Sequence, residues 1–137
     1  MRKTTVIAGV LGLVLIAAAA AAAKPAVSDY QACLDASGGV DPVMKRCGAD
    51  EIARQDNVLA AVTRKLRGAL TPKLKASLDR GERAFLAYRD AQCGFAHDQG
   101  SPGTIAGLLY QSCVLDLTAA QIKTLREALD NVGRWKN

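Results

Sequence analysis

Four cysteines behind an apolar N-terminal segment constrain the fold of this chain more than any other feature. An even number of cysteines in a small exported protein predicts two disulfides. Four cysteines allow three connectivities, and pairing between sequence neighbours, Cys33–Cys47 and Cys93–Cys113, is the simplest of them. Each such pair would stabilise the fold by about 3 kcal/mol in the chain-entropy model. No C-x-x-C spacing occurs, so we expect structural disulfides, with no metal and no other cofactor.

The N-terminal segment decides the compartment. Arg2 and Lys3 precede an apolar run over residues 4–23, which ends in alanines that offer A-x-A in several frames. This order is typical of a secretory signal cleaved before Lys24. A retained membrane anchor is the alternative, because the apolar run is long enough to span a bilayer. We therefore expect a signal peptide over 1–23 and a single domain over 24–137, located in the periplasm or secreted.

Cleavage changes the meaning of the net charge. The whole chain carries +5, and loss of Arg2 and Lys3 leaves +3. A mildly basic protein in a compartment without nucleic acid gives little support to nucleic-acid binding. Half of the residues are apolar, which excludes a disordered tail. We expect membrane contact only through the signal segment, and the sequence leaves the oligomeric state open.

The first half of the domain has helical periodicity. Ser28 to Ser37 is a short helix candidate that ends at Gly38-Gly39. Asp41-Pro42 then resembles an N-cap followed by proline at the first helical position. A single apolar stripe continues from there to Leu70, made of Ile52, Leu59, Val62, Leu66 and Leu70. Gly48 is expected to fray or bend the first turns.

The second half of the domain shows the same pattern of helix starts and apolar stripes. Thr71-Pro72 starts a helix whose inner face is predicted to hold Leu74, Leu78, Phe85 and Tyr88, with Gly81 allowing close packing. Gly94 to Gly103 is predicted to be irregular, and helix resumes near Thr104. Thr118-x-x-Gln121 fits a capping box, which predicts a break near Leu117. No segment alternates with period two. The sequence thus predicts an all-α bundle of three to five helices, built on an antiparallel helical hairpin.

One segment resembles a known family. Residues 85–93, Phe-Leu-Ala-Tyr-Arg-Asp-Ala-Gln-Cys, are similar to the aromatic-x-x-Tyr-Arg-Asp-x-x-Cys signature of the LprI-like lysozyme-inhibitor domain family. Other landmarks follow in the family's order over Cys33 to Leu129: Cys47, Asp56, Leu59, Gly100-Ser101, Tyr110, Cys113, Thr118 and Leu125. The chain departs from the family pattern at Ala60, Thr63, Phe85 and Gln121. The resemblance implies an exported, disulfide-bonded helical domain that binds a lysozyme.

Catalytic patterns are missing from the sequence. His97 is the one imidazole, and neither G-x-S-x-G nor a phosphate-binding G-x-x-x-x-G-K-[ST] loop occurs. We therefore expect a non-catalytic binding protein rather than an enzyme. An envelope structural module, or a module that binds an anionic ligand without lysozyme activity, is the alternative.

Two segments are candidates for binding. Tyr88, Arg89 and Asp90 point about 100° apart on a helix, so all three cannot face one ligand. In one interpretation Tyr88 is buried while Arg89 or Asp90 pairs with a neighbouring helix; in the other, Arg89 or Asp90 lines a binding groove. The second candidate is the loop over residues 95–103, with His97 and Asp98 near its middle. A Cys93–Cys113 disulfide would hold this loop at both ends and so order it before binding. A loop that is already ordered loses less entropy on binding.

Charge bears on the choice of partner. Animal lysozymes are strongly basic, so a +3 protein gains no overall electrostatic steering toward them. One end of the predicted hairpin gathers cations that are suited to an anionic envelope component: Arg64, Lys65, Arg67, Lys73 and Lys75.

Overall fold

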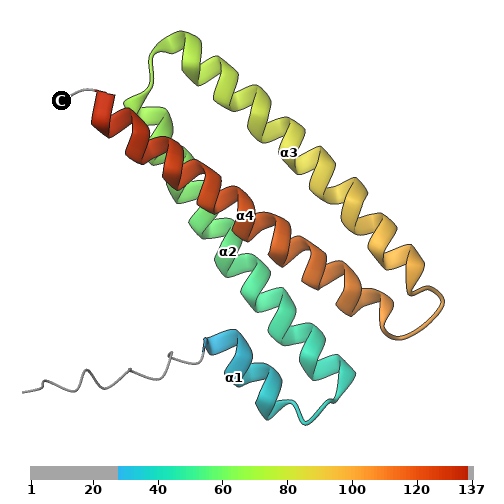
Figure 1. Ribbon diagram of the computed structural model, residues 1–137. Coiled ribbons are helices and arrows are strands. Elements are labelled where there is room, and N and C mark those ends of the chain that lie inside the picture. Colours follow the sequence, from blue (N-terminus) through green and yellow to red (C-terminus); the bar gives the residue numbers. More distant parts are fainter. Residues whose placement is uncertain (1–27, 136–137) are drawn as a thin grey trace, which may run out of the picture.

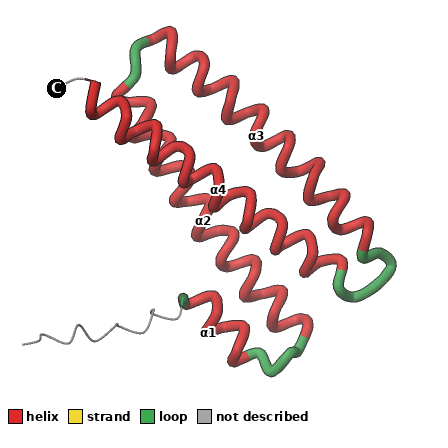
Figure 2. The backbone as a smooth tube through the Cα atoms, in the orientation of Figure 1, coloured by secondary structure: helices red, strands yellow, loops and turns green. Residues whose placement is uncertain are grey.

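The computed structural model describes residues 28–135, which form four helices and no strand. They are α1 (Asp29–Ala36), α2 (Asp41–Ala69), α3 (Pro72–Gln99) and α4 (Ala106–Trp135) (Figures 1 and 2). The predicted all-α bundle is therefore confirmed. The predicted signal segment lies outside the described residues. None of the helices within residues 28–135 is both long and apolar enough to cross a bilayer.

Capping residues and glycines explain where the first two helices begin. Ser28 caps α1, since its hydroxyl accepts a hydrogen bond from the Gln31 amide at 3.1 Å. Gly38 and Gly39, both at positive φ, then turn the chain toward α2. Val40, rather than the expected Asp41, is the N-cap of α2. Asp41 is already helical, and its carboxylate accepts a bond from Lys45 Nζ at 2.8 Å.

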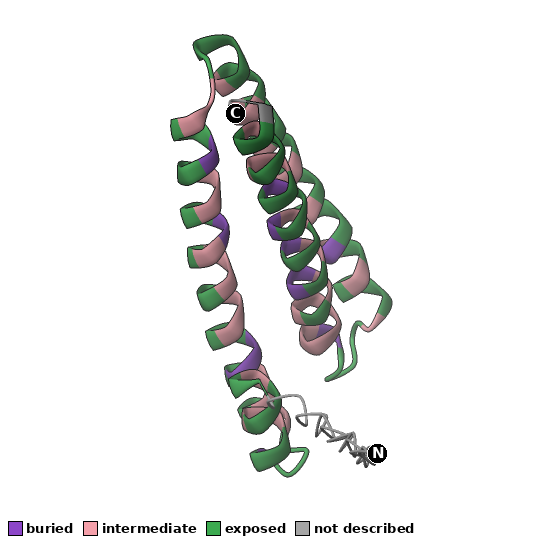
Figure 3. Ribbon diagram, turned by 60° about the vertical axis from the view of Figure 1, so that its left-hand side comes forward, coloured by how far each residue is buried: buried purple, intermediate pink, exposed green. Residues whose placement is uncertain are grey.

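The hairpin prediction needs one correction. α2 and α3 run antiparallel and are joined by the short Leu70-Thr71 turn, but their backbones do not pack closely on each other. α4 instead packs along both of them (Figure 1). Leu59 and Leu66 of α2 and Ile122 and Leu125 of α4 form the buried core. Figure 3 shows buried positions on the inner sides of the helices. Partly buried residues of all three long helices surround the four core residues: Val58, Val62, Leu70, Leu78, Phe85, Ala128, Leu129 and Val132.

The predicted break near Leu117 is wrong, because α4 is continuous from Ala106 to Trp135. Thr118 and Gln121 do not form a capping box. The Thr118 hydroxyl is buried and accepts a bond from Arg89, while the Gln121 amide donates to Glu82. The Thr118-x-x-Gln121 pattern therefore marks two contacts from α4 to α3 and not the start of a helix.

Two glycines behave differently from the expectation. Gly81 does not allow close packing, since a Cβ atom there would meet nothing within 4 Å. Gly48 does not interrupt α2. It is buried against α4, where a Cβ atom would collide with the Gln111 side chain. Gln111 Nε2 donates to the Lys45 carbonyl at 2.8 Å, so Gly48 makes room for a polar link between α2 and α4.

The neighbour pairing of cysteines is confirmed. Cys33–Cys47 joins α1 to α2 with 5.8 Å between Cα atoms, and Cys93–Cys113 joins α3 to α4 with 5.5 Å. α1 contains no buried residue, so the first disulfide is its principal attachment to the bundle. Cys93, in contrast, is fully buried.

Candidate functional site

A groove of about 630 Å³ lies between α2 and α3. We call it the α2/α3 groove. Its α2 wall is made of Asp56, Leu59, Ala60, Thr63, Arg64 and Arg67. Its α3 wall is made of Asp79, Glu82, Arg83, Leu86 and Arg89. The volume is within the range of small-molecule sites, and the walls mix charged and apolar side chains.

Three polar bridges cross this groove. Arg89 Nη1 lies 2.7 Å from Asp56 Oδ1, and Thr63 Oγ1 donates to Glu82 Oε2 at 3.2 Å. Nearer the α2–α3 turn, Arg67 Nη1 pairs with Asp79 Oδ1. These bridges fix the register of α2 and α3, whose backbones do not pack directly on each other.

Arg89 is a mostly enclosed charged member of the groove. Its side chain is only 12% exposed. It donates to Asp56 of α2 and, at 2.9 Å, to Thr118 of α4, while its guanidinium lies 5.9 Å from the centre of the Phe85 ring. Arg89 therefore ties α3 to both other long helices.

The structure contains elements of both interpretations of the Tyr88-Arg89-Asp90 triplet. Arg89 pairs with α2 and α4, as the first interpretation expects, and it also lines the α2/α3 groove, as the second expects. The expected burial of Tyr88 is wrong, because Tyr88 is 54% exposed. The inner face of α3 runs through Leu78, Phe85 and Arg89, and a step of about 100° per residue turns Tyr88 outward. Asp90 is also exposed, with Oδ1 4.0 Å from Arg89 Nε.

The predicted loop over residues 95–103 is largely helical. α3 continues to Gln99, so His97 and Asp98 lie in its last turn instead of in a loop. The connection to α4 comprises residues 100–105. His97 Nδ1 lies 3.4 Å from Asp98 Oδ1, and both side chains are exposed. The Cys93–Cys113 disulfide does enclose this connection, as expected.

Gly100 explains why the chain reverses so tightly. A Cβ atom on Gly100 would lie 2.8 Å from Leu109 Cδ1 and 2.9 Å from the Ala106 backbone. The Gly103 amide donates to the Gly100 carbonyl at 2.7 Å. The end of the molecule formed by residues 95–105 is named the α3–α4 tip. It exposes two large apolar side chains, Phe95 and Ile105.

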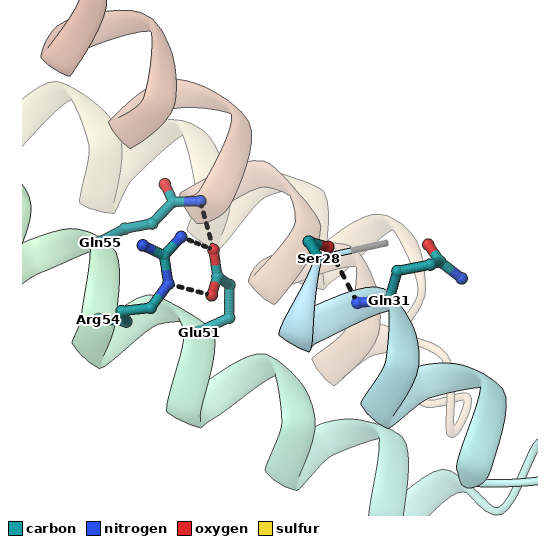
Figure 4. Close-up of polar contacts among 5 residues, drawn as sticks. All are labelled: Ser28, Gln31, Glu51, Arg54 and Gln55. Atoms are coloured by element: carbon teal, nitrogen blue, oxygen red, sulfur yellow. Dashed lines mark hydrogen bonds and ion pairs between the residues drawn. The ribbon is translucent and has the colours of Figure 1, made fainter. Parts of the chain in front are cut away.

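A second charged cluster lies on α2 next to α1 (Figure 4). Arg54 Nε and Nη2 donate to the Glu51 carboxylate at 2.7 and 2.5 Å, and Gln55 Nε2 donates to it at 3.0 Å. The hydrogen bond from Arg54 lowers the pKa of Glu51, against the opposing effect of burial, and Gln55 adds to the lowering. The same pairing raises the pKa of Arg54.

The groove itself was not predicted as a site. Sequence analysis singled out Arg89 as a possible groove residue, and Arg64 and Arg67 as part of a cationic end. It did not identify Glu82, Arg83 or Leu86. These residues come together through the register of two helices, which no local pattern encodes. Within residues 28–135, no three His, Cys, Asp or Glu side chains are placed to hold a metal ion.

Within residues 28–135, the four packed helices and two disulfides define a small, disulfide-bonded helical domain. Residues 33–125 match the family described as lysozyme inhibitor LprI, and the chain belongs to this family. The family is named for a non-catalytic activity. Two departures from its pattern, Ala60 and Thr63, line the α2/α3 groove.

A further comparison finds an uncharacterized protein, R02472, of Rhizobium meliloti (strain 1021), which is 33% identical over 58 residues. That alignment spans 40% of this chain and 42% of the Rhizobium protein, so less than half of either protein is covered. No solved structure matches the chain.

Proposed function

We propose that this chain is an exported, non-catalytic protein that inhibits a lysozyme, and that the α3–α4 tip is the part that enters the enzyme's cleft. Membership of the LprI family supports the activity. The two disulfides support export, because such bonds persist in oxidising compartments. A narrow helical end is better suited to a cleft than a flat helix face is.

The observation that carries the proposal is the chemistry of the tip. Phe95 and Ile105 are 59% and 54% exposed on a segment that a disulfide encloses. Aromatic anchors that are buried on binding supply much of the energy of protein interfaces. His97 lies two residues beyond Phe95, on nearly the opposite side of α3. Its ring N–H is available to carboxylates on the other wall of a lysozyme cleft. A tip that is already ordered loses little entropy on binding.

The charge of the protein predicts how such a complex responds to salt. A +3 protein is not steered toward a basic lysozyme, so affinity would come from contacts at the tip. Inhibition should therefore change little with ionic strength.

Lysis assays with animal, invertebrate and phage lysozymes test this function. We expect Phe95→Ala combined with His97→Ala to weaken inhibition of the sensitive lysozyme by about tenfold or more. Leu74→Ala is the control, because Leu74 is another exposed apolar residue, at the other end of α3. Undiminished inhibition by the tip variant would refute the role of the tip. Failure to inhibit any of the three enzyme types would refute the function.

A second candidate function is an envelope module that binds an anionic component. The cationic side chains near the α2–α3 turn favour it, and Arg64, Lys65 and Lys73 are all exposed. Simple surface attraction of this kind should disappear in high salt, unlike tip-mediated inhibition.

A further inference from the structure

The three bridges across the α2/α3 groove fix the register of its walls. α2 and α3 are antiparallel, so each step forward on α2 is matched by a step back on α3. Asp56 faces Arg89, Thr63 faces Glu82, and Arg67 faces Asp79. In this register Ala60 falls opposite Leu86. Arg64 and Arg83 each lie next to a member of the Thr63–Glu82 bridge, one on either wall of the groove.

Arg64 and Arg83 therefore place like charges on the two walls of the groove, next to the same bridge. Both side chains are exposed and line the groove. Among the described residues, neither lies within ion-pair distance of a carboxylate, whereas Arg67 and Arg89 in the same groove are both paired. Like charges that share a groove repel each other. An anion placed between the two guanidinium groups would replace this repulsion by attraction.

Glu82 forms no ion pair with either arginine, although its carboxylate lines the same groove. Its Oε2 accepts a bond from Thr63 and its Oε1 accepts one from Gln121 at 2.7 Å. These neutral donors hold the carboxylate toward α2 and α4. The two arginines are thus left available to a ligand.

The neighbouring surface is apolar. Leu59 is buried on the α2 wall, Ala60 contributes only a methyl group, and Leu86 is 40% exposed on the α3 wall. Two guanidinium groups bind phosphate oxygens through paired N–H donors, which a single ammonium group does not do. Cations next to an apolar surface indicate a ligand that has an anionic head and an apolar body.

We propose that the α2/α3 groove binds a small amphiphilic phosphate, with the phosphate between Arg64 and Arg83 and the apolar part on Ala60 and Leu86. This site gives the second candidate function a specific class of ligand. It rests on that function only in taking the ligand to be an anion. Lysozyme inhibition by the tip uses a different stretch of α3 and does not depend on the site. A monomeric lipid or a soluble phosphate ester would supply the same chemistry.

The test uses the oxidised, exported protein and three probes: hexyl phosphate, inorganic phosphate and phosphatidylglycerol vesicles. Binding of the soluble probes is followed by backbone amide chemical shifts. We expect hexyl phosphate to shift groove amides and to bind about tenfold or more tighter than inorganic phosphate, because its methylene groups leave water. Equal affinities would overturn the amphiphile assignment, and shifts confined to residues outside the groove would overturn the site.

Paired variants separate the site from general charge. Arg64→Gln with Arg83→Gln should weaken hexyl phosphate binding by about tenfold or more, through loss of charge-assisted hydrogen bonds. Lys65→Gln with Arg80→Gln removes the same charge from positions outside the groove lining and should leave affinity within about twofold. Equal losses in the two variants would overturn the proposal.

The vesicle arm identifies the source of the phosphate. Vesicle binding that is lost only in the Arg64/Arg83 variant supports a lipid ligand, and hexyl phosphate binding without vesicle binding supports a soluble ester. Vesicle binding that falls equally in both variants, with no binding of hexyl phosphate, means surface attraction and overturns the site. Thermal unfolding provides the folding control, because removing two exposed, mutually repelling arginines should not lower the unfolding midpoint.

Discussion

Arg89 on α3 and Asp56 on α2 are joined by a 2.7 Å hydrogen bond across the groove, and the same Arg89 nitrogen also donates to Thr118 on α4. One side chain thus links three helices. The Asp56 side chain is 44% exposed to water, whereas the Arg89 side chain is mostly buried. Loss of Arg89 should therefore affect the structure more than loss of Asp56. Removing the arginine leaves a fully buried hydroxyl, that of Thr118, without its Arg89 donor.

We expect Arg89→Ala to lower the free energy of unfolding by about 1–3 kcal/mol, since a buried acceptor loses its donor. Urea denaturation followed by circular dichroism measures the change. Arg83→Ala is the matched control, because Arg83 is an exposed arginine of the same groove, and it should change stability by less than about 0.5 kcal/mol.

A double-mutant cycle with Asp56→Ala isolates the pair. Additive effects of the two substitutions would contradict the coupling described above. Lysozyme inhibition per folded molecule should be unchanged in Arg89→Ala, because Arg89 lies outside the α3–α4 tip. A selective loss of inhibition would instead support the interpretation of Arg89 as a binding residue.

The two disulfides should contribute differently. Replacing Cys93 and Cys113 by serine should cost about 3 kcal/mol of stability in the chain-entropy model, because this bond closes the connection between two core helices. Replacing Cys33 and Cys47 should mainly release α1, which buries no residue of its own. Hydrogen exchange should then show loss of protection confined to residues 29–36, with the unfolding of α2–α4 nearly unchanged. Equal losses of global stability in the two variants would refute this division.

We expect replacement by alanine to have opposite effects on stability at Gly100 and Gly81. Gly100→Ala should destabilise the protein by about 1–3 kcal/mol, because the added methyl group meets the Ala106 backbone and cannot be relieved by a side-chain rotation alone. Gly81→Ala is the matched control. It adds a methyl group to an open helix position and should stabilise the protein by about 1 kcal/mol. Thermal melts of the two variants should move in opposite directions.

Acid should weaken the contact at Glu51. The hydrogen bond from Arg54 lowers the pKa of Glu51 in the folded state below its ordinary value of 4.5. A lowered folded-state pKa means that the stabilisation is present above the unfolded-state pKa and is lost as the pH falls through the folded-state value. We therefore expect stability to decrease below about pH 4.5, with a smaller decrease in Glu51→Gln.

The size of the Glu51 effect should be about 0.2–0.5 kcal/mol, as for other charged pairs three residues apart on a helix. Chemical denaturation at a series of pH values measures it. Glu127→Gln is the control, because the pair of Glu127 with Lys123 is longer, at 3.7 Å, and well exposed. A pH profile that Glu51→Gln leaves unchanged would contradict the assignment.

Local patterns predicted much of this fold because helix ends and disulfide loops depend on residues close in sequence. Ser28, Gly38-Gly39, and the prolines after Asp41 and Thr71 mark helix boundaries through backbone conformation alone. The neighbour pairing of cysteines was predicted on similar grounds. The errors arose where a local rule competed with packing. The Thr118-x-x-Gln121 pattern resembles a cap, but its side chains satisfy Arg89 and Glu82 on α3.

The sequence by itself therefore determined an all-helical, twice-bridged domain and its family. It placed Arg89 on a helix but left open whether Arg89 pairs with a neighbouring helix or lines a groove. Only the tertiary structure decided that α4 packs along both α2 and α3, that His97 and Asp98 are helical, and that Arg64 and Arg83 line one groove. The physical reason is that helix period and capping act over a few residues, whereas the register between two helices depends on side chains far apart in the chain.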